Sequence, residues 1–154
     1  MATTRQFCTF RVADLFLGIA VEHVQEVLRY QQMTRVPLAP TFVAGLINLR
    51  GQIVTALDLR HRLRLPARPV EQLPMNVVLR DRDNAVSLLV DRIGDVMEVD
   101  GDLHEPVPST VSDDMKALFA GAYKLPNQLL LVLDDERLLN DGESAKPTDC
   151  LLAG

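Results

Sequence analysis

The feature that most constrains this chain is an internal repeat. Residues 42–63, FVAGLINLRGQIVTALDLRHRL, align without gaps on residues 118–139, LFAGAYKLPNQLLLVLDDERLL. The identities are Ala44/Ala120, Gly45/Gly121, Leu49/Leu125, Gln52/Gln128, Leu57/Leu133, Asp58/Asp134 and Leu63/Leu139. The offset of 76 residues (118 minus 42) exceeds the roughly 20–50 residues of solenoid repeats, so it indicates a duplicated lobe.

The segments that precede this repeat also match, but more weakly. Residues 10–30 align on residues 79–99 with Arg11/Arg80, Asp14/Asp83, Val21/Val90 and Val27/Val96 identical, and Glu22/Asp91 and Glu26/Asp95 alike in charge. Two similar lobes must bury a seam against each other, and such seams commonly bind ligands or partners. We therefore expect the functional surface at the seam.

Composition favours a compact protein with an aliphatic core. Hydrophobic residues make up 47% of the 154, and Trp is absent. No apolar run approaches the roughly 18–20 residues of a membrane span, and the N-terminal MATTRQF lacks a signal-peptide pattern. Cys8 and Cys150 form no CxxC pair, so we expect a reduced, cytoplasmic protein.

Charge is distributed unevenly along the chain. Residues 1–70 carry nine Arg and four acidic residues, a net +5, whereas residues 71–154 carry seven Lys and Arg against seventeen Asp and Glu, a net −10. This asymmetry suits docking to charged protein surfaces or to a second copy, and ordinary solvated surface is the alternative. The acidic total, and the lack of aromatic residues in the basic run DLRHRLRLPAR, argue against nucleic acid binding.

Hydrophobic patterning predicts short strands with few helical turns. In the first half we expect strands over 8–12, 15–20, 46–49 and 52–57, with a hairpin turn at Arg50-Gly51. Val21, Val24 and Leu28 recur with helical spacing and predict a short amphipathic helix. A proline-containing linker over 66–74 follows.

The second half is expected to repeat this plan. As repeat mates, Leu57 and Leu133 should both be buried in the central strand of their lobes, and Asp58 and Asp134 should cap the turns that follow. Strands are predicted over 75–80, 85–90 and 128–133, a loop over 99–110, a helix capped by Ser112, and a helical turn over 136–139. Many short strands with regular turn signals favour small barrels. We expect one domain over 5–141, with lobes over 7–68 and 75–141, exchange of terminal strands between them as an open alternative, and a flexible tail over 142–154.

Sequence signatures of catalysis are absent. His23, His61 and His104 show no metal-ligand spacing, and no GxGxxG, Walker or GxSxG pattern occurs. The acidic pairs near residues 113 and 134 resemble charges at helix starts. We expect no catalytic residues, no metal and no cofactor, and hence no enzyme.

The segment 45–54, GLINLRGQIV, followed by Asp58-Leu59-Arg60, resembles the hallmark of the CheW family of chemotaxis coupling proteins. The flanking sequences VQEV at 24–27, TRVP at 34–37 and VDRIGDV at 90–96 agree, and the resemblance extends over about 7–140. It implies a mainly β fold, in which two pseudo-repeated SH3-like five-stranded β-barrel lobes pack on a shared hydrophobic core with a few short helices.

The resemblance also implies a function and a site. It implies a non-enzymatic adaptor that couples methyl-accepting chemotaxis receptors to the histidine kinase CheA, with recruitment to membrane-associated receptor arrays and self-association in array rings. The implied receptor-binding groove consists of Val24, Glu26, Arg50, Ile53 and Val96. From the residues alone, Arg50 is better explained as a solvated turn residue, Val24 and Ile53 as packing residues, and Glu26 as a partner of Arg29 on its own helix.

The implied partners are the regulatory domain of CheA and the cytoplasmic tips of the receptors, with no nucleic acid and no membrane insertion. Kinase-facing residues are not assigned by the sequence. Two alternatives stay open: a coupler of a non-motility chemosensory pathway, and a small ligand-binding sensor that uses the groove between the lobes.

Overall fold

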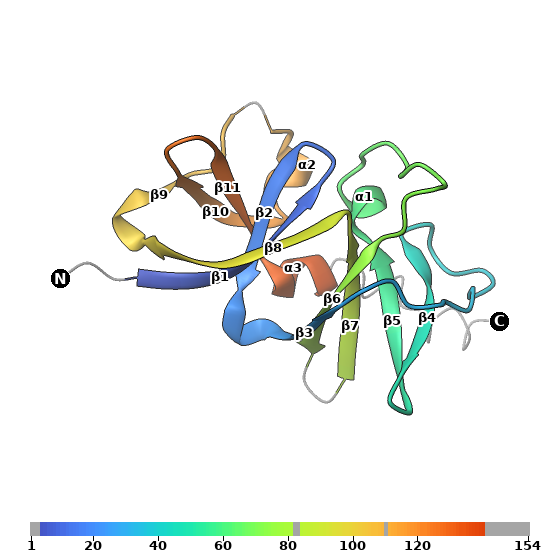
Figure 1. Ribbon diagram of the computed structural model, residues 1–154. Helices are drawn as coiled ribbons and strands as arrows, with labels where there is room; N and C mark the ends of the chain where they lie inside the picture. Colours follow the sequence, from blue (N-terminus) through green and yellow to red (C-terminus); the bar gives the residue numbers. More distant parts are fainter. Residues whose placement is uncertain (1–3, 82–83, 110, 141–154) are drawn as a thin grey trace.

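The computed structural model describes residues 4–81, 84–109 and 111–140, which form two β-sheets (Figure 1). Sheet A has the strand order β8-β1-β2-β11-β10-β9, and sheet B has the order β3-β6-β7-β5-β4. The strands of sheet A are β1 (Thr4–Val12), β2 (Leu15–Ala20), β8 (Arg92–Asp100), β9 (His104–Glu105), β10 (Phe119–Lys124) and β11 (Leu129–Leu133). Those of sheet B are β3 (Val24–Leu28), β4 (Val43–Leu49), β5 (Gln52–Asp58), β6 (Met75–Asp81) and β7 (Asn84–Val90).

The helical segments between the strands are all short. They are η1 (Val21–His23), α1 (Leu59–Arg62), η2 (Gly101–Leu103), α2 (Asp113–Lys116) and α3 (Asp135–Asn140). Ser112 caps α2 and Asp58 caps α1, each by accepting a hydrogen bond from a backbone N–H of the first turn, and Asp134 accepts from the Arg137 N–H at the start of α3. The caps expected at these three positions are confirmed.

The two halves of the chain exchange their first hairpins. The β1–β2 hairpin lies in sheet A between β8 and β11 of the second half, and the β6–β7 hairpin lies in sheet B between β3 and β5 of the first half. Each insertion creates one parallel pair of strands, β2 with β11 in sheet A and β7 with β5 in sheet B. The exact lobe and linker boundaries stay predictions, and the tail expected over 142–154 lies outside the described residues.

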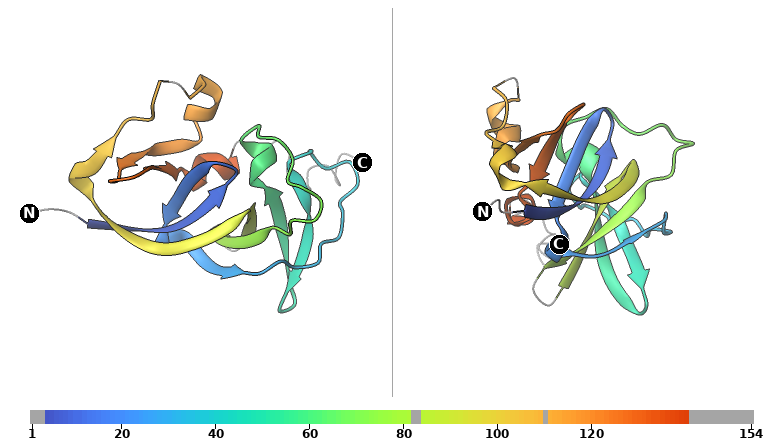
Figure 2. Two further views of the ribbon diagram at one scale, coloured as in Figure 1. Left: turned by 45° about the horizontal axis from the view of Figure 1, so that its top comes forward. Right: turned by 60° about the vertical axis from the view of Figure 1, so that its left-hand side comes forward.

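Each sheet curls toward a closed barrel in the same way: the chain that follows one edge strand continues to the opposite edge of the sheet. In sheet B the chain beyond β3 reaches the opposite edge, where Thr34 forms a bridge with Leu46 of β4. In sheet A the chain beyond β8 continues through η2 into β9, which pairs with β10 at the opposite edge. The views in Figures 1 and 2 show the two curled sheets lying side by side, with β8 and β3 as corresponding edge strands.

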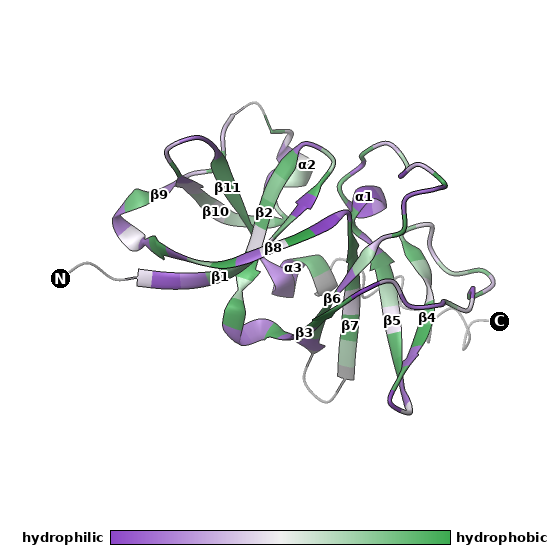
Figure 3. Ribbon diagram, viewed as in Figure 1, coloured by the Kyte–Doolittle hydropathy of each residue, from purple (hydrophilic) through white to green (hydrophobic). Residues whose placement is uncertain are grey.

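The hydrophobic core has three parts. Phe7, Val99 and Leu130 belong to a cluster within sheet A, and Ile47, Val54 and Val78 to one within sheet B. The largest cluster joins both sheets, with Phe10, Leu17, Leu57, Leu79, Leu88, Leu131 and Leu133 among its buried members. Hydrophobic residues accordingly concentrate along the strands, and hydrophilic ones at the loops (Figure 3). The mainly β fold with a shared core is confirmed.

The helix predicted over 21–28 is wrong. Only η1 is helical, and Val24–Leu28 form the edge strand β3, in which Val24 opposes Leu79 and Val27 opposes Val77 of β6. Backbone pairing with β6 and the β-branched valines favour the strand over a short helix without tertiary support. Thr9 on β1 is buried, and its hydroxyl donates to the Asp95 carbonyl oxygen.

A buried ionic cluster, which we call the Asp91 cluster (Asp91, Arg60 and Arg68), ties the two sheets together. Asp91 is the single residue between β7 of sheet B and β8 of sheet A. Its carboxylate accepts hydrogen bonds from Arg60, from Arg68 and from the Ala13 N–H in the β1–β2 turn. The Asp91 side chain is 7% exposed, so these partners replace its lost hydration.

The Asp91 cluster makes stability depend on pH. Burial alone would raise the pKa of the Asp91 carboxyl, but the hydrogen bonds from Arg60, Ala13 and Arg68 outweigh it and hold this pKa below its ordinary value. A depressed pKa adds stability above the ordinary value of about 4, and that stability is lost as pH falls through the folded-state pKa. Relative to Asp91→Asn, the extra unfolding free energy of the wild type should be constant above about pH 5 and should shrink below about pH 4.

Urea titrations of both proteins from about pH 7 to about pH 3 measure this difference. A difference that did not change with pH would show that the ionised carboxylate of Asp91 contributes nothing to folding.

Candidate partner-binding site

A tight turn joins β4 to β5 and presents Arg50 to solvent. Arg50 and Gly51 both have positive φ, 52° and 86°, as the two central residues of a type I′ turn require. The Asn48 side chain accepts a hydrogen bond from the Gly51 N–H at 2.9 Å and stabilises this geometry. The hairpin predicted from Arg50-Gly51 is confirmed, and the Arg50 side chain is 70% exposed.

Replacing Gly51 should cost stability through the backbone alone. A Cβ at this position would meet no atom within 4 Å, so the strain of a positive φ is the expected cause of any loss. We expect Gly51→Ala to lower the free energy of unfolding by about 1 kcal/mol, and Gly51→Asn by less, since Asn tolerates this region. Denaturant titration measures both. Equal stability of Gly51→Ala and the wild type would contradict the assigned turn.

Glu26 on the edge strand β3 holds Arg50 in place. Nη1 of Arg50 donates to Oε2 of Glu26 at 2.8 Å and Nη2 to Oε1 at 2.6 Å, a two-pronged contact. The hydrogen bond from Arg50 is the main cause that lowers the pKa of the Glu26 carboxyl, and the same bond raises the pKa of Arg50. The partner of Glu26 is therefore Arg50 across the sheet, in place of the pairing with Arg29 that the sequence left open.

The other three expected groove residues differ in their exposure and in the sheet to which they belong. Ile53 lies on β5 just after the turn and is 60% exposed. Val24 lies on β3, is half-buried and packs against the shared core. Val96 lies on β8 of the other sheet and is 55% exposed. Four of the five residues thus belong to sheet B, and Val96 to the corresponding edge of sheet A.

Sequence reasoning missed Val27, which is 42% exposed beside Glu26 on β3. A signal was available, because Val27 and Val96 are repeat mates, as are Glu26 and Asp95. Corresponding edge strands therefore present an exposed valine next to an acidic residue on each sheet. Because the sequence predicts a helix over 21–28, it does not reveal that this segment and β8 are corresponding edge strands.

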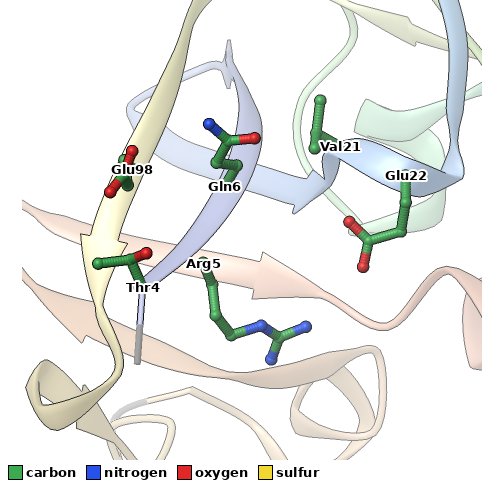
Figure 4. A pocket seen from close by; sticks show the side chains of 6 residues that line it. All are labelled: Thr4, Arg5, Gln6, Val21, Glu22 and Glu98. Carbon is green, nitrogen blue, oxygen red and sulfur yellow. The ribbon is translucent and has the colours of Figure 1, made fainter. Parts of the chain in front are cut away.

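Two surface hollows lie apart from these residues. One, of about 360 Å³, is lined by Thr4, Arg5, Gln6, Val21, Glu22 and Glu98, which are mostly polar or charged (Figure 4). The other, of about 670 Å³, lies beneath the loop over 35–41 and includes Asp58 and His61. Within the described residues, no group of three or more His, Cys, Asp or Glu side chains is arranged to hold a metal ion, and no helix is long and apolar enough to cross a membrane.

Comparison with known proteins shows which family has this architecture. The model of the CheW-like domain matches residues 6–143. The chain belongs to the CheW family. Two relatives are the chemotaxis protein CheW of Bacillus subtilis, 31% identical over 94% of this chain and 92% of the relative, and the probable chemotaxis protein CheW of Rhizobium etli, 30% identical over 91% and 90%.

A solved CheW structure has the same fold. The scaffolding protein TtCheW from Thermoanaerobacter tengcongensis superposes with a TM-score of 0.77 at 25% identity, over 86% of this chain and 90% of that chain. CheW is a family of chemotaxis scaffold proteins, and membership confirms the resemblance found in the sequence. It agrees with an adaptor that works by binding.

Proposed function

We propose that this protein is a non-enzymatic adaptor that couples the cytoplasmic tips of methyl-accepting chemotaxis receptors to the regulatory domain of the histidine kinase CheA. The observation that carries the proposal is the exposed Arg50, fixed by Glu26 beside exposed apolar side chains on a CheW-family scaffold. Such an arrangement is suited to binding another protein surface.

Val24, Glu26, Arg50, Ile53 and Val96 form the proposed receptor-binding groove. Glu26 uses two of the five N–H donors of Arg50, which leaves the others for a carboxylate or carbonyl oxygen of the receptor. Because Glu26 already fixes the guanidinium, little side-chain entropy remains to be lost on binding. Ile53 and Val96 supply exposed apolar area, and Val24 supports β3 from the core side.

The two sheets offer different surfaces for further contacts. Residues 21–90, which contain sheet B, carry nine Arg and six Asp or Glu, a net +3, whereas residues 91–140 carry four Lys or Arg and eleven Asp or Glu, a net −7. Opposite charge on two linked barrels favours a fixed orientation between neighbours in an assembly. This supports the proposed recruitment from the cytoplasm to receptor arrays, with the kinase domain and further copies as neighbours.

Reconstitution tests the proposal. Receptor cytoplasmic fragments, CheA and this protein are mixed, and autophosphorylation of CheA is followed with and without receptor. We expect receptor to change kinase activity only when this protein is present, and a pull-down to recover all three. The coupling role would be refuted if, without this protein, receptor still changed kinase activity and receptor still co-purified with CheA. A metabolite that raised the melting temperature, without any kinase or receptor binding, would favour the sensor alternative.

A further inference from the structure

We propose that Asp91 is a positioning residue: with Arg60 and Arg68 it sets the direction in which β8 leaves β7, and so places Val96 in the receptor groove. This inference rests on the proposed function, because Val96 is one wall of that groove. It adds three residues that lie outside the groove but determine its shape.

The position of Asp91 at the crossing between the sheets is the first reason. Its backbone N–H donates to the Arg11 carbonyl oxygen at 2.9 Å, and Oδ2 accepts from the Ala13 N–H at 2.7 Å. Main chain and side chain are thus both fixed to the β1–β2 hairpin of sheet A. One residue later β8 begins and pairs with β1, where Arg92 opposes Arg11, so Asp91 fixes how this pair of strands meets sheet B.

The arginine contacts fix the same carboxylate from the side of sheet B. Nη2 of Arg60, in α1 directly after β5, lies 2.5 Å from Oδ2 of Asp91, and its Nε lies 3.0 Å from Oδ1. Nε of Arg68, in the linker, donates to Oδ1 at 2.9 Å. The three side chains are between 7% and 12% exposed, and since the loss of hydration offsets much of the attraction between such charges, we assign the Asp91 cluster a role in geometry more than in net stability.

The other crossing between the sheets is held much less firmly. The chain passes from β2 to β3 through η1, where Glu22, the repeat mate of Asp91, is exposed. There His23 Nδ1 contacts Asp135 Oδ1 at 3.0 Å, with the His23 side chain about half exposed. The two edge strands therefore have different supports where the chain crosses between the sheets: β3 follows the half-exposed His23–Asp135 contact, and β8 follows the Asp91 cluster.

Between Asp91 and Val96 the strand is seated closely on β1. The Thr9 hydroxyl donates to the Asp95 carbonyl oxygen at 2.5 Å, and a Cβ on Gly94 would lie only 2.6 Å from that hydroxyl oxygen. This close approach leaves β8 little freedom to adjust by itself. Val96 itself opposes Cys8 of β1, so β8 and β1 would move together, and a change at Asp91 would turn both strands, with Val96, relative to sheet B.

Hydrogen exchange tests the positioning role without any partner. In Asp91→Asn, the acceleration of exchange should be at least about threefold greater for amides of β8 than for amides of β3, beyond the acceleration that the lower free energy of unfolding gives to both strands. Glu22→Gln at the corresponding crossing is the matched control and should change neither strand. Uniform acceleration in both strands, or none in β8, would overturn the inference.

A double-mutant cycle tests the consequence for binding. Val96→Ala should weaken affinity for a receptor cytoplasmic fragment in the wild-type background. In the Asp91→Asn background this loss of affinity should be at least about threefold smaller, because β8 no longer presents residue 96 correctly. The penalty of Arg50→Ala should stay within about twofold, since Glu26 still holds that side chain. Full additivity at Val96 would show that Asp91 merely stabilises the fold.

A milder variant covers the case in which Asp91→Asn does not fold, and hydrogen exchange and receptor binding can each fail independently. If Asp91→Asn fails to fold, Arg68→Ala removes one contact to the carboxylate, keeps the Arg60–Asp91 pair, and should reproduce both effects to a smaller extent. If neither Arg50→Ala nor Val96→Ala weakens receptor binding, the groove assignment fails, whereas hydrogen exchange still decides whether Asp91 directs β8.

Discussion

Arg50→Glu should weaken binding to a receptor cytoplasmic fragment by well over tenfold. The change places a carboxylate at the centre of the proposed interface, and inverting one partner of a desolvated charged contact costs roughly 2–5 kcal/mol. The fold should persist, because Arg50 is exposed and surface substitutions usually change stability by about 0.5 kcal/mol, with some added repulsion from Glu26. Titration calorimetry measures the affinity, and circular dichroism checks the fold.

Two variants of this chain serve as controls for this prediction. Arg80→Glu reverses an exposed charge on β6 of the same sheet and should leave receptor binding nearly unchanged. The charge swap Glu26→Arg with Arg50→Glu rebuilds the ion pair in reverse. If the swap restored receptor binding, the pair would serve only to support the turn. If binding stayed weak while stability recovered, at least one side chain of the pair would itself contact the receptor.

Leu57→Ala and Leu133→Ala should each lower the free energy of unfolding by about 2–5 kcal/mol. Both leucines are buried in the cluster that joins the two sheets, as predicted from their place in the repeat, and truncation removes apolar burial and leaves a cavity. Since each sheet contains strands from both halves, the loss should shift one cooperative transition that involves the whole domain.

Val70→Ala is the matched control, because Val70 is almost fully exposed in the linker. It should change stability by less than about 0.5 kcal/mol. Denaturant titration followed by two probes, far-ultraviolet circular dichroism and the fluorescence of Tyr30 and Tyr123, measures all three variants. Two separated transitions would show that the sheets fold independently and that the cluster does not unite them.

Local chemistry made some features predictable. Arg50-Gly51 between apolar segments indicates a two-residue hairpin, and Ser112, Asp58 and Asp134 precede helical turns that they cap, because these signals act within a few residues. The burial of Leu57 and Leu133 followed from the repeat, since equivalent positions in two copies of one unit share an environment.

Features decided by distant contacts were not predictable in the same way. A short segment such as 21–28 has apolar spacing compatible with helix or strand, and only the neighbouring β6 selects the strand. The Glu26–Arg50 contact and the Asp91 cluster join residues separated by 23 to 31 positions or more, and no local pattern encodes which acid meets which arginine. The five groove residues were named through the family resemblance, and their shared role stays a proposal.

The exchanged hairpins have a consequence for fragments of this protein. A chain cut within residues 66–74 gives two pieces, one with three strands of sheet B (β3, β4 and β5) and the other with four strands of sheet A (β8 to β11), and each has a hairpin that fits only the other piece. Neither piece can complete a sheet alone, so separately expressed pieces should fold only on mixing. Two copies of a single repeat could meet the same requirement as a homodimer, by exchanging their hairpins so that both sheets are completed.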